Sequence, residues 1–197
     1  MNPDLPPRDD CGDHLAEVQY TLPTALEAFH DLYVKAYLNY AYTMLGDKEA
    51  AIAVVRRCFS HLALNWAQVI RGESPEAYAW ALLKARVDTH LRLAGKSSRM
   101  VETAAFQRTA RAALESVRCQ FEVMETSLGL YTAIASLPER QYDVIVLLHV
   151  LGYPSDRVAR IMGVKRDTVR SHRRLARRRI AKKLGLPQSM AADDDKE

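Results

Sequence analysis

The sequence predicts an all-α protein made of two small helical domains that are joined by a flexible tether. Apolar residues recur at helical spacing along most of the chain, and the alternation typical of strands is absent. A helix-turn-helix pattern lies between Tyr153 and Gly185, and its second helix is strongly basic. The chain has 197 residues, 48% of them apolar, which is enough for one or two buried cores.

The first predicted helix begins near Thr24, because Thr24 and Glu27 have the spacing of a capping box. It ends at Gly46, a residue type that commonly terminates helices. Tyrosines are spread around this helix between Tyr33 and Tyr42, so we expect at least two of them to be exposed. The predicted buried stripe consists of Leu26, Phe29, Leu32, Ala36, Tyr40 and Met44.

Two further helices complete the predicted N-terminal domain, residues 20–95. Asp47 can cap the second helix, and Ser74 followed by Pro75 can start the third, because proline at the first helical turn has no N–H to lose. The second buried stripe holds Ala51, Val55, Cys58, Leu62, Trp66 and Val69, and the third holds Ala79, Leu83, Val87 and Leu91.

The remaining segments surround a second domain. Residues 1–19 are acidic and contain prolines, so we expect them to be disordered, and residues 96–131 are expected to be a linker. The second domain spans residues 132–186 and opens with a helix that follows Leu137. Residues 187–197 form an acidic tail.

Three small or branched residues carry the helix-turn-helix prediction. Ala159 allows two helices to cross closely, Gly163 supplies the positive φ of the turn, and Val169 packs the second helix inward. Residues 165–183 contain ten cations opposed only by Asp167, a net charge of +9 against +4 for the whole chain. This concentration favours a helix that enters the DNA major groove, although a solvated basic helix or a loose polyanion-binding segment would share the composition.

The sequence argues against several other classes of protein. Three distant cysteines fit a reducing compartment rather than a disulfide framework, and Cys11 with His14 has no second ligand pair, so we expect no metal site. No segment is apolar enough to span a membrane or act as a secretion signal, which predicts a cytoplasmic protein without membrane insertion. Glycine-rich phosphate loops and nucleophile–base spacings are absent, so we expect neither an enzyme nor a bound cofactor.

The order of these parts resembles the sigma factors of bacterial RNA polymerase, in the two-domain form of the extracytoplasmic-function (ECF) group. The C-terminal similarity is carried by Leu137-Pro-Glu-Arg-Gln141, Val146-Leu-Leu-His-Val-Leu-Gly152, Ala159-Arg-Ile-Met-Gly-Val164, Thr168-Val-Arg-Ser171 and Ala176-Arg-Arg-Arg-Ile180. A weaker, collinear N-terminal similarity is carried by Leu45-Gly-Asp47, Val54-Val55, Phe59, Ser74-Pro75 and His90-Leu-Arg92.

The resemblance implies an alternative sigma factor that binds bacterial core RNA polymerase and directs transcription from particular promoters. Its C-terminal domain would read the −35 element of promoter DNA as a duplex. Cations at the start of the recognition helix can reach base edges, and later cations grip phosphates. We assign Arg166, Arg170, Ser171 and Arg174 to the groove, and Lys165, Arg173, Arg177 and Arg178 to the phosphates.

The N-terminal domain would then dock on polymerase and capture unstacked bases of the −10 element. Candidate −10 residues are Trp80, Lys84, Arg86, His90 and Arg92. A large aromatic at helical spacing such as Trp80 more often packs in a core than stacks on a base, and His90 is more often a surface or packing residue. Candidate polymerase-binding residues are Val55, Arg56, Phe59 and Leu62.

The predicted docking helix departs from the family pattern. Ala50 to Ala53, followed by Arg56 and Arg57, replace an edge that is usually polar and acidic. This change leaves an alternative open: a sigma-derived DNA-binding regulator or interaction protein that does not productively engage polymerase. We also hypothesise an anti-sigma protein as a further partner, since the apolar edge and the tether would suit one.

Overall fold

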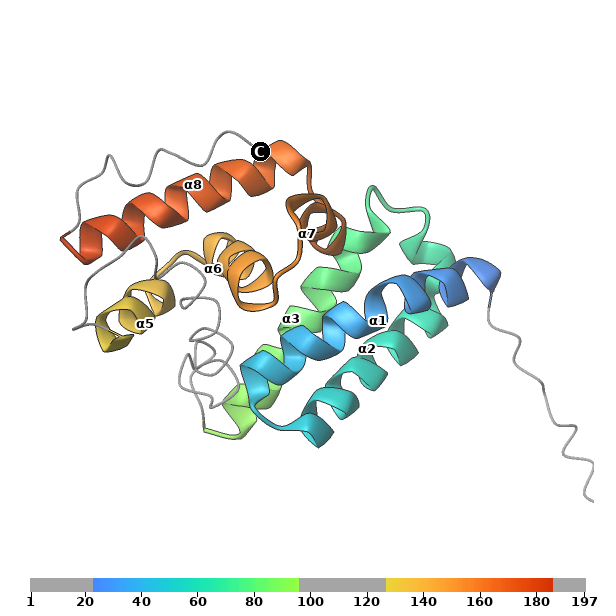
Figure 1. The fold of residues 1–197 in the computed structure, drawn as a ribbon. Helices are drawn as coiled ribbons and strands as arrows, with labels where there is room; N and C mark the ends of the chain where they lie inside the picture. Colours follow the sequence, from blue (N-terminus) through green and yellow to red (C-terminus); the bar gives the residue numbers. More distant parts are fainter. Residues whose placement is uncertain (1–22, 96–126, 186–197) are drawn as a thin grey trace, which may run out of the picture.

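The computed structural model describes residues 23–95 and 127–185, and all regular secondary structure within these two segments is helical (Figure 1). The all-α prediction is therefore confirmed for the described residues. The predictions for residues 1–19, 187–197 and most of the linker lie outside the described segments. The helices are α1 (Thr24–Leu45), α2 (Lys48–Val69), α3 (Pro75–Leu93), α5 (Ser127–Ala135), α6 (Glu139–Ile145), the π-helical turn η2 (Val146–Val150), α7 (Ser155–Met162) and α8 (Arg166–Lys183).

Helices α1, α2 and α3 pack against one another as an N-terminal three-helix unit (Figure 1). The predicted caps are present: the Asp47 carboxylate accepts hydrogen bonds from the N–H groups of Glu49 and Ala50 at 2.8 and 3.0 Å, and Ser74 Oγ accepts one from the N–H of Ala77 at 3.1 Å. All residues of the predicted α2 and α3 stripes are buried. The α1 stripe is buried except for Leu32, which is 42% exposed.

Two expectations for α1 are wrong. Thr24 is already helical, the capping position is Pro23, and no side chain caps this end; the Pro23 carbonyl instead accepts from Leu26 and Glu27 N–H groups. Of the four tyrosines, only Tyr42 is exposed. The other three are buried because α1 is covered on one side by α2 and α3 and on another by the C-terminal unit.

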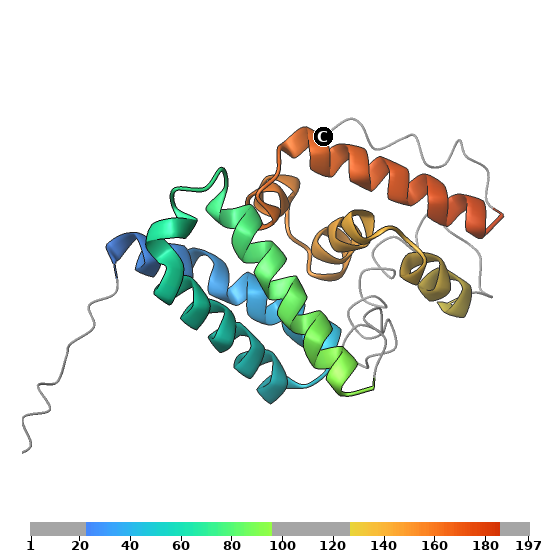
Figure 2. The same ribbon diagram turned by 180° about the vertical axis from the view of Figure 1, so that it is seen from behind.

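Helices α5 to α8 form the C-terminal unit, in which α8 packs across α5, α6 and α7 (Figures 1 and 2). Helix α5 begins at Ser127, five residues before the predicted start of this domain. After α6 the backbone widens into η2, where the Leu151 N–H reaches the Val146 carbonyl at 2.9 Å. Gly163 ends α7 with φ 63°, as the predicted turn requires.

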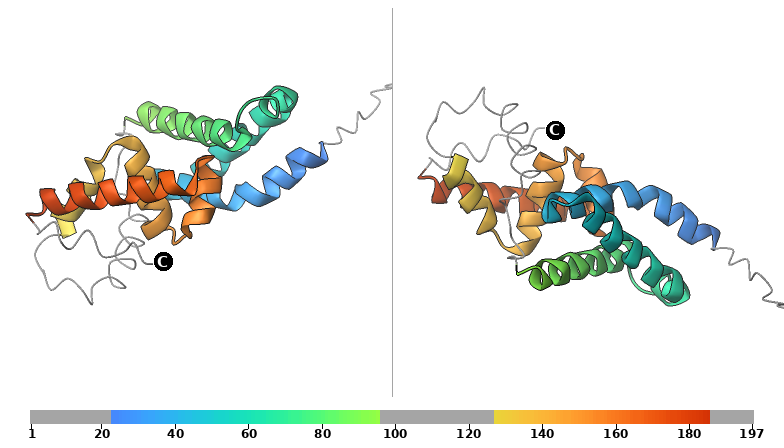
Figure 3. Two further views of the ribbon diagram at one scale, coloured as in Figure 1. Left: turned by 90° about the horizontal axis from the view of Figure 1, so that it is seen from above. Right: turned by 90° about the horizontal axis from the view of Figure 1, so that it is seen from below.

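The two units share one continuous core, and α7 packs against the N-terminal part of α3 (Figures 2 and 3). Gly163 marks the closest approach: a Cβ atom added there would lie 2.2 to 2.7 Å from the backbone and Cβ of Ala77 on α3. The glycine therefore serves both the turn of the helix-turn-helix and its packing on the N-terminal unit.

We predict that Gly163→Ala destabilises the protein more than Gly152→Ala. Both glycines have positive φ (63° and 68°), so alanine meets a backbone penalty of about 1 kcal/mol or more at either position. Only position 163 adds the collision with Ala77, since nothing lies within 4 Å of a Cβ at position 152. Urea unfolding of the full chain measures both free energies, and equal losses would contradict close packing at Gly163.

Candidate nucleic-acid interface

The turn between α7 and α8 places the start of α8 at the surface. The Val164 N–H donates to the Ala159 carbonyl at 2.9 Å, and the Lys165 carbonyl accepts from Thr168 and Val169 at 3.0 and 3.3 Å. Val169 and Ala176 are fully buried beneath the helix. The inner face of α8 is thereby fixed, and its opposite face points away from the protein.

The outward face of α8 carries the residues that the sequence analysis assigned to DNA. All four groove candidates (Arg166, Arg170, Ser171 and Arg174) are exposed. Of the phosphate candidates, Lys165 and Arg178 are exposed and Arg173 and Arg177 are half-buried. Asp167, Arg170, Ser171 and Arg174 line one hollow on this face.

Two groove candidates form ion pairs with neighbouring carboxylates. Arg166 Nε lies 3.1 Å from Asp156 Oδ1 on α7, and Arg170 Nη1 lies 3.7 Å from Asp167 Oδ1 one turn earlier. All four side chains are more than half exposed, so each pair is worth less than about 1 kcal/mol. Such contacts orient the guanidinium groups and can be exchanged for contacts with DNA.

The −10 candidates on α3 lie in mixed environments. Trp80 is 2% exposed and packs edge-on against Tyr40 in the core. Lys84 is paired with the carboxylates of Glu139 and Asp143 on α6. Arg86 and His90 are half-buried, and Arg92 is exposed and paired with Asp88 at 2.9 Å.

The polymerase-binding candidates on α2 differ in how far their side chains are buried. Val55 and Leu62 are 3% and 0% exposed, so their side chains belong to the core of the three-helix unit. Phe59 is half-buried between Tyr37 and His30. Arg56 lies on the exposed face of the helix.

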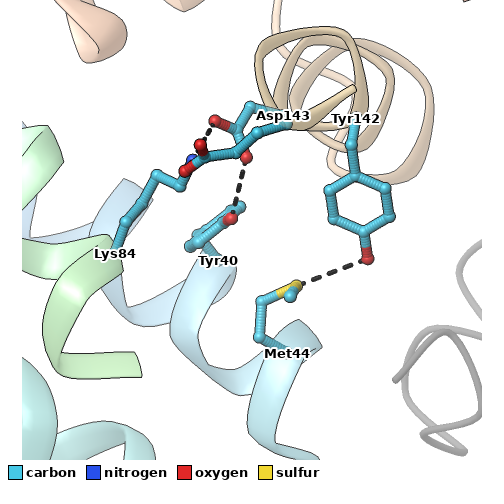
Figure 4. A network of polar contacts seen from close by, with 6 residues as sticks. Tyr40, Met44, Lys84, Tyr142 and Asp143 are labelled. Atoms are coloured by element: carbon cyan, nitrogen blue, oxygen red, sulfur yellow. Dashed lines mark hydrogen bonds and ion pairs between the residues drawn. The ribbon is translucent and has the colours of Figure 1, made fainter. Parts of the chain in front are cut away.

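The sequence analysis missed a buried polar network that joins the two units (Figure 4). Asp143 on α6 is 1% exposed; its carboxylate accepts a hydrogen bond from the Tyr40 hydroxyl at 3.0 Å and an ionic one from Lys84 Nζ at 2.7 Å. Lys84 also pairs with Glu139. The only sequence signal was an aspartate inside the apolar stretch from Tyr142 to Leu148.

Burial and ion pairing shift the pKa of the Asp143 carboxyl in opposite directions. Removal from water raises its pKa above the usual range, and the Lys84 ammonium and the Tyr40 hydroxyl lower it again by smaller amounts. Burial and the neighbouring carboxylate also raise the pKa of the Tyr40 hydroxyl, which keeps this group a donor.

Further contacts surround the network. Asn39 Nδ2 donates to the Tyr153 hydroxyl at 3.1 Å, and the Tyr142 hydroxyl donates to Met44 Sδ at 3.5 Å (Figure 4). The Arg157 guanidinium donates to the Leu32 carbonyl and lies 5.5 Å from the centre of the Tyr33 ring. The interface between the units is therefore polar at its edges as well as at its centre.

Residues 23–95 and 127–185 contain no group of His, Cys, Asp or Glu side chains able to hold a metal ion. Their helices are too short or too polar to cross a bilayer. Burial raises the pKa of the Cys58 thiol to about 12, which makes this cysteine a packing residue rather than a nucleophile.

The fold and the charged face define a helix-turn-helix protein of the DNA-binding class. Comparison with protein families is more specific: residues 127–180 match the model described as sigma-70, region 4. The C-terminal unit is thus a sigma-70 region 4 domain, and the sigma-factor resemblance of the sequence is confirmed.

No curated protein sequence matches the chain. Among solved structures, one similar chain belongs to a co-crystal structure of the sigma factor RpoE in complex with the anti-sigma factor NepR from Bartonella quintana. The identity is 16% and the TM-score is 0.41, over 83% of this chain and 99% of that chain.

We predict that the stability of the wild-type protein relative to Asp143→Asn falls as pH rises. A carboxyl whose pKa is raised in the folded state binds its proton more tightly there than in the unfolded chain. Its contribution is complete below the unfolded pKa of about 4 and is lost as pH passes through the raised folded value. Urea midpoints of both proteins between pH 4.5 and 8 measure this difference, and a constant difference would contradict a raised pKa.

Proposed function

We propose that this protein is an alternative sigma factor of the ECF type, which binds core RNA polymerase and directs it to promoters that α8 selects. The observation that carries this proposal is the exposed basic face of α8, held outward by a sigma-70 region 4 domain. In this role the protein is a dissociable specificity subunit and performs no catalysis itself.

The spacing of the groove candidates suits a DNA major groove. Residues 166, 170 and 174 follow one another at intervals of four, so they form one stripe along two helical turns. The stripe is about 12 Å long at 1.5 Å per residue, which is close to the width of the major groove. Arginines in this stripe can donate two hydrogen bonds to the acceptor edge of guanine.

Docking on polymerase is proposed for the exposed face of α2. Because Val55 and Leu62 are core residues, this face offers Arg56, Arg57 and the partly covered ring of Phe59. Ile52 adds apolar area at 38% exposure. A surface of this composition fits an acidic partner with an apolar centre, and an anti-sigma protein is a second partner proposed for it.

The direct test of the proposal is reconstituted transcription. Full-length protein is mixed with bacterial core polymerase, co-elution is measured, and transcripts from a set of genomic promoter fragments are mapped. Starts at particular promoters that require the protein would support the proposal. Failure to co-elute, with duplex binding retained, would support a DNA-binding regulator instead.

We predict that Arg170→Ala weakens binding to a selected duplex by about 1–3 kcal/mol and relaxes the preference for one base pair. The preferred duplex is first obtained by selection from random sequences. Arg178→Ala is the matched control, because a phosphate contact should weaken specific and random duplexes alike and reduce the salt slope by about one. If Arg170→Ala also weakens both duplexes equally, Arg170 is a phosphate contact.

We further predict that the double charge reversal Arg56→Glu/Arg57→Glu lowers affinity for core polymerase at least tenfold, about 1.4 kcal/mol, while duplex binding stays unchanged. Lys35→Glu/Lys48→Glu is the matched control, since it reverses two exposed charges elsewhere on α1 and α2. Fluorescence anisotropy of labelled protein titrated with core polymerase gives both affinities. Equal effects of the two double variants would argue against docking through this face of α2.

A further inference from the structure

We propose that Asp167 on α8 is a specificity-determining residue: its carboxylate accepts a hydrogen bond from the N4 amino group of a cytosine in the major groove, while the neighbouring Arg170 donates to guanine. The inference rests on the proposed binding of duplex DNA by α8 and deepens it by naming a base pair that the helix selects. Asp167 is the single anion of residues 165–183, which contain ten cations.

Asp167 occupies the outermost line of α8. It lies two residues before Val169 and nine before Ala176, which are both fully buried. At 3.6 residues per turn these spacings place Asp167 about 160° and 180° around the helix from the two buried residues. Its side chain is 89% exposed, against 51% for Arg170. Asp167 therefore points directly away from the protein, in the first turn of the helix that a helix-turn-helix presents to base edges.

The carboxylate of Asp167 is not used to cap α8. Lys165 stands at the capping position, and this end of the helix has no side-chain cap among the described residues. Asp167 Oδ1 lies 3.7 Å from Arg170 Nη1, which is longer than a hydrogen bond. An acid in the first turn interacts favourably with the helix dipole, but that effect does not require the outermost position. The acceptor oxygens of Asp167 thus remain accessible to a base.

An anion on this surface weakens the attraction of α8 to DNA in general. Phosphates repel it whatever the base sequence, whereas the surrounding cations attract them. A base edge offsets this repulsion where it presents a hydrogen-bond donor to the carboxylate. In the major groove the donors are the amino groups of cytosine and adenine, and the acceptors on guanine and thymine repel a carboxylate. Asp167 therefore discriminates between bases by attraction to some and repulsion from others.

The arrangement of Asp167 with Arg170 favours cytosine over adenine. A carboxylate can accept from cytosine N4, and an arginine can donate to guanine O6 and N7. A C·G pair presents this donor and these acceptors next to each other, as the carboxylate and the guanidinium stand side by side on α8. Both side chains line the same hollow, together with Ser171 and Arg174. One C·G pair therefore satisfies both side chains, whereas an adenine would leave Arg170 without its guanine.

The test measures binding of the full chain to duplex DNA by fluorescence anisotropy. A preferred duplex is first selected from random sequences with the wild-type protein. Each of its cytosines is then replaced in turn by 2-pyrimidinone, the analogue without the 4-amino group. We expect one replacement to weaken wild-type binding about tenfold, the cost of one lost base contact. In Asp167→Ala the same replacement should have no effect, and the comparison of the two proteins cancels any effect of the analogue on the duplex itself.

The variants give two further readouts. Asp167→Ala should bind random duplexes more tightly than wild type, because a charge that phosphates repel is removed. The ratio of its affinities for selected and random duplexes should fall about tenfold. Asp167→Asn should move the preference at this position from cytosine to adenine, whose N6 and N7 an asparagine binds with two hydrogen bonds.

Asp156→Ala is the matched control. It removes a carboxylate that is 63% exposed and paired with Arg166, but it does so on α7 and leaves the outermost line of α8 intact. It should keep the tenfold response to the cytosine analogue. Urea unfolding of the variants measures any loss of stability at the start of α8, and such a loss alone would not remove the response to one amino group.

The inference is overturned if no cytosine analogue weakens wild-type binding, or if Asp167→Ala and wild type respond equally to the analogue. It is also overturned if Asp167→Ala strengthens binding to selected and random duplexes by the same factor, which would make Asp167 a source of general repulsion. All of these readouts use DNA without polymerase. A failed transcription assay would therefore count against the proposed function and leave this inference standing.

Discussion

The arrangement of the two helical units depends on one buried carboxylate. Asp143 lies on α6 with 1% of its surface exposed, and an ionised group at that depth is stable only if it is paired and hydrogen-bonded. Its two partners come from different helices of the N-terminal unit, Tyr40 on α1 and Lys84 on α3. Because Asp143 contacts both partners, α6 is held across α1 and α3. The rest of the region 4 domain is positioned with α6, and Gly163 lies against Ala77.

Local chemistry determines most of the individual helices, and for that reason the sequence predicted them well. Asp47, Ser74 and Gly163 act within a few residues of their own positions, so their roles can be seen in the sequence, and the structure places each as expected. The buried stripes of α2 and α3 follow from the helical period in the same way. Thr24 was the exception: its side chain was expected to cap α1, but the Pro23 carbonyl accepts the hydrogen bonds of the first N–H groups instead.

Packing between the units could not be predicted from the sequence, because it depends on residues about a hundred positions apart. Tyr40 and Asp143 each look ordinary alone: one is an aromatic residue in a mixed stripe, the other a carboxylate that is usually solvated. The error over tyrosine exposure has a related cause, since Tyr33 and Tyr40 are in contact with Arg157 and Asp143 of the C-terminal unit as well as with rings of their own unit. The exposed cations of α8 were assigned correctly to an outer face because Val169 and Ala176 fix the helix orientation locally.

The placement of charge connects this packing to function. Arg166 and Arg170 on α8 are exposed, and their pairs with Asp156 and Asp167 are exposed and weak. Lys84 is instead enclosed by the carboxylates of Asp143 and Glu139 on the opposite unit. The candidate DNA-binding cations on α8 and on α3 therefore differ in accessibility: Arg166, Arg170 and Arg174 are exposed, whereas Lys84 is held at the interface between the two units.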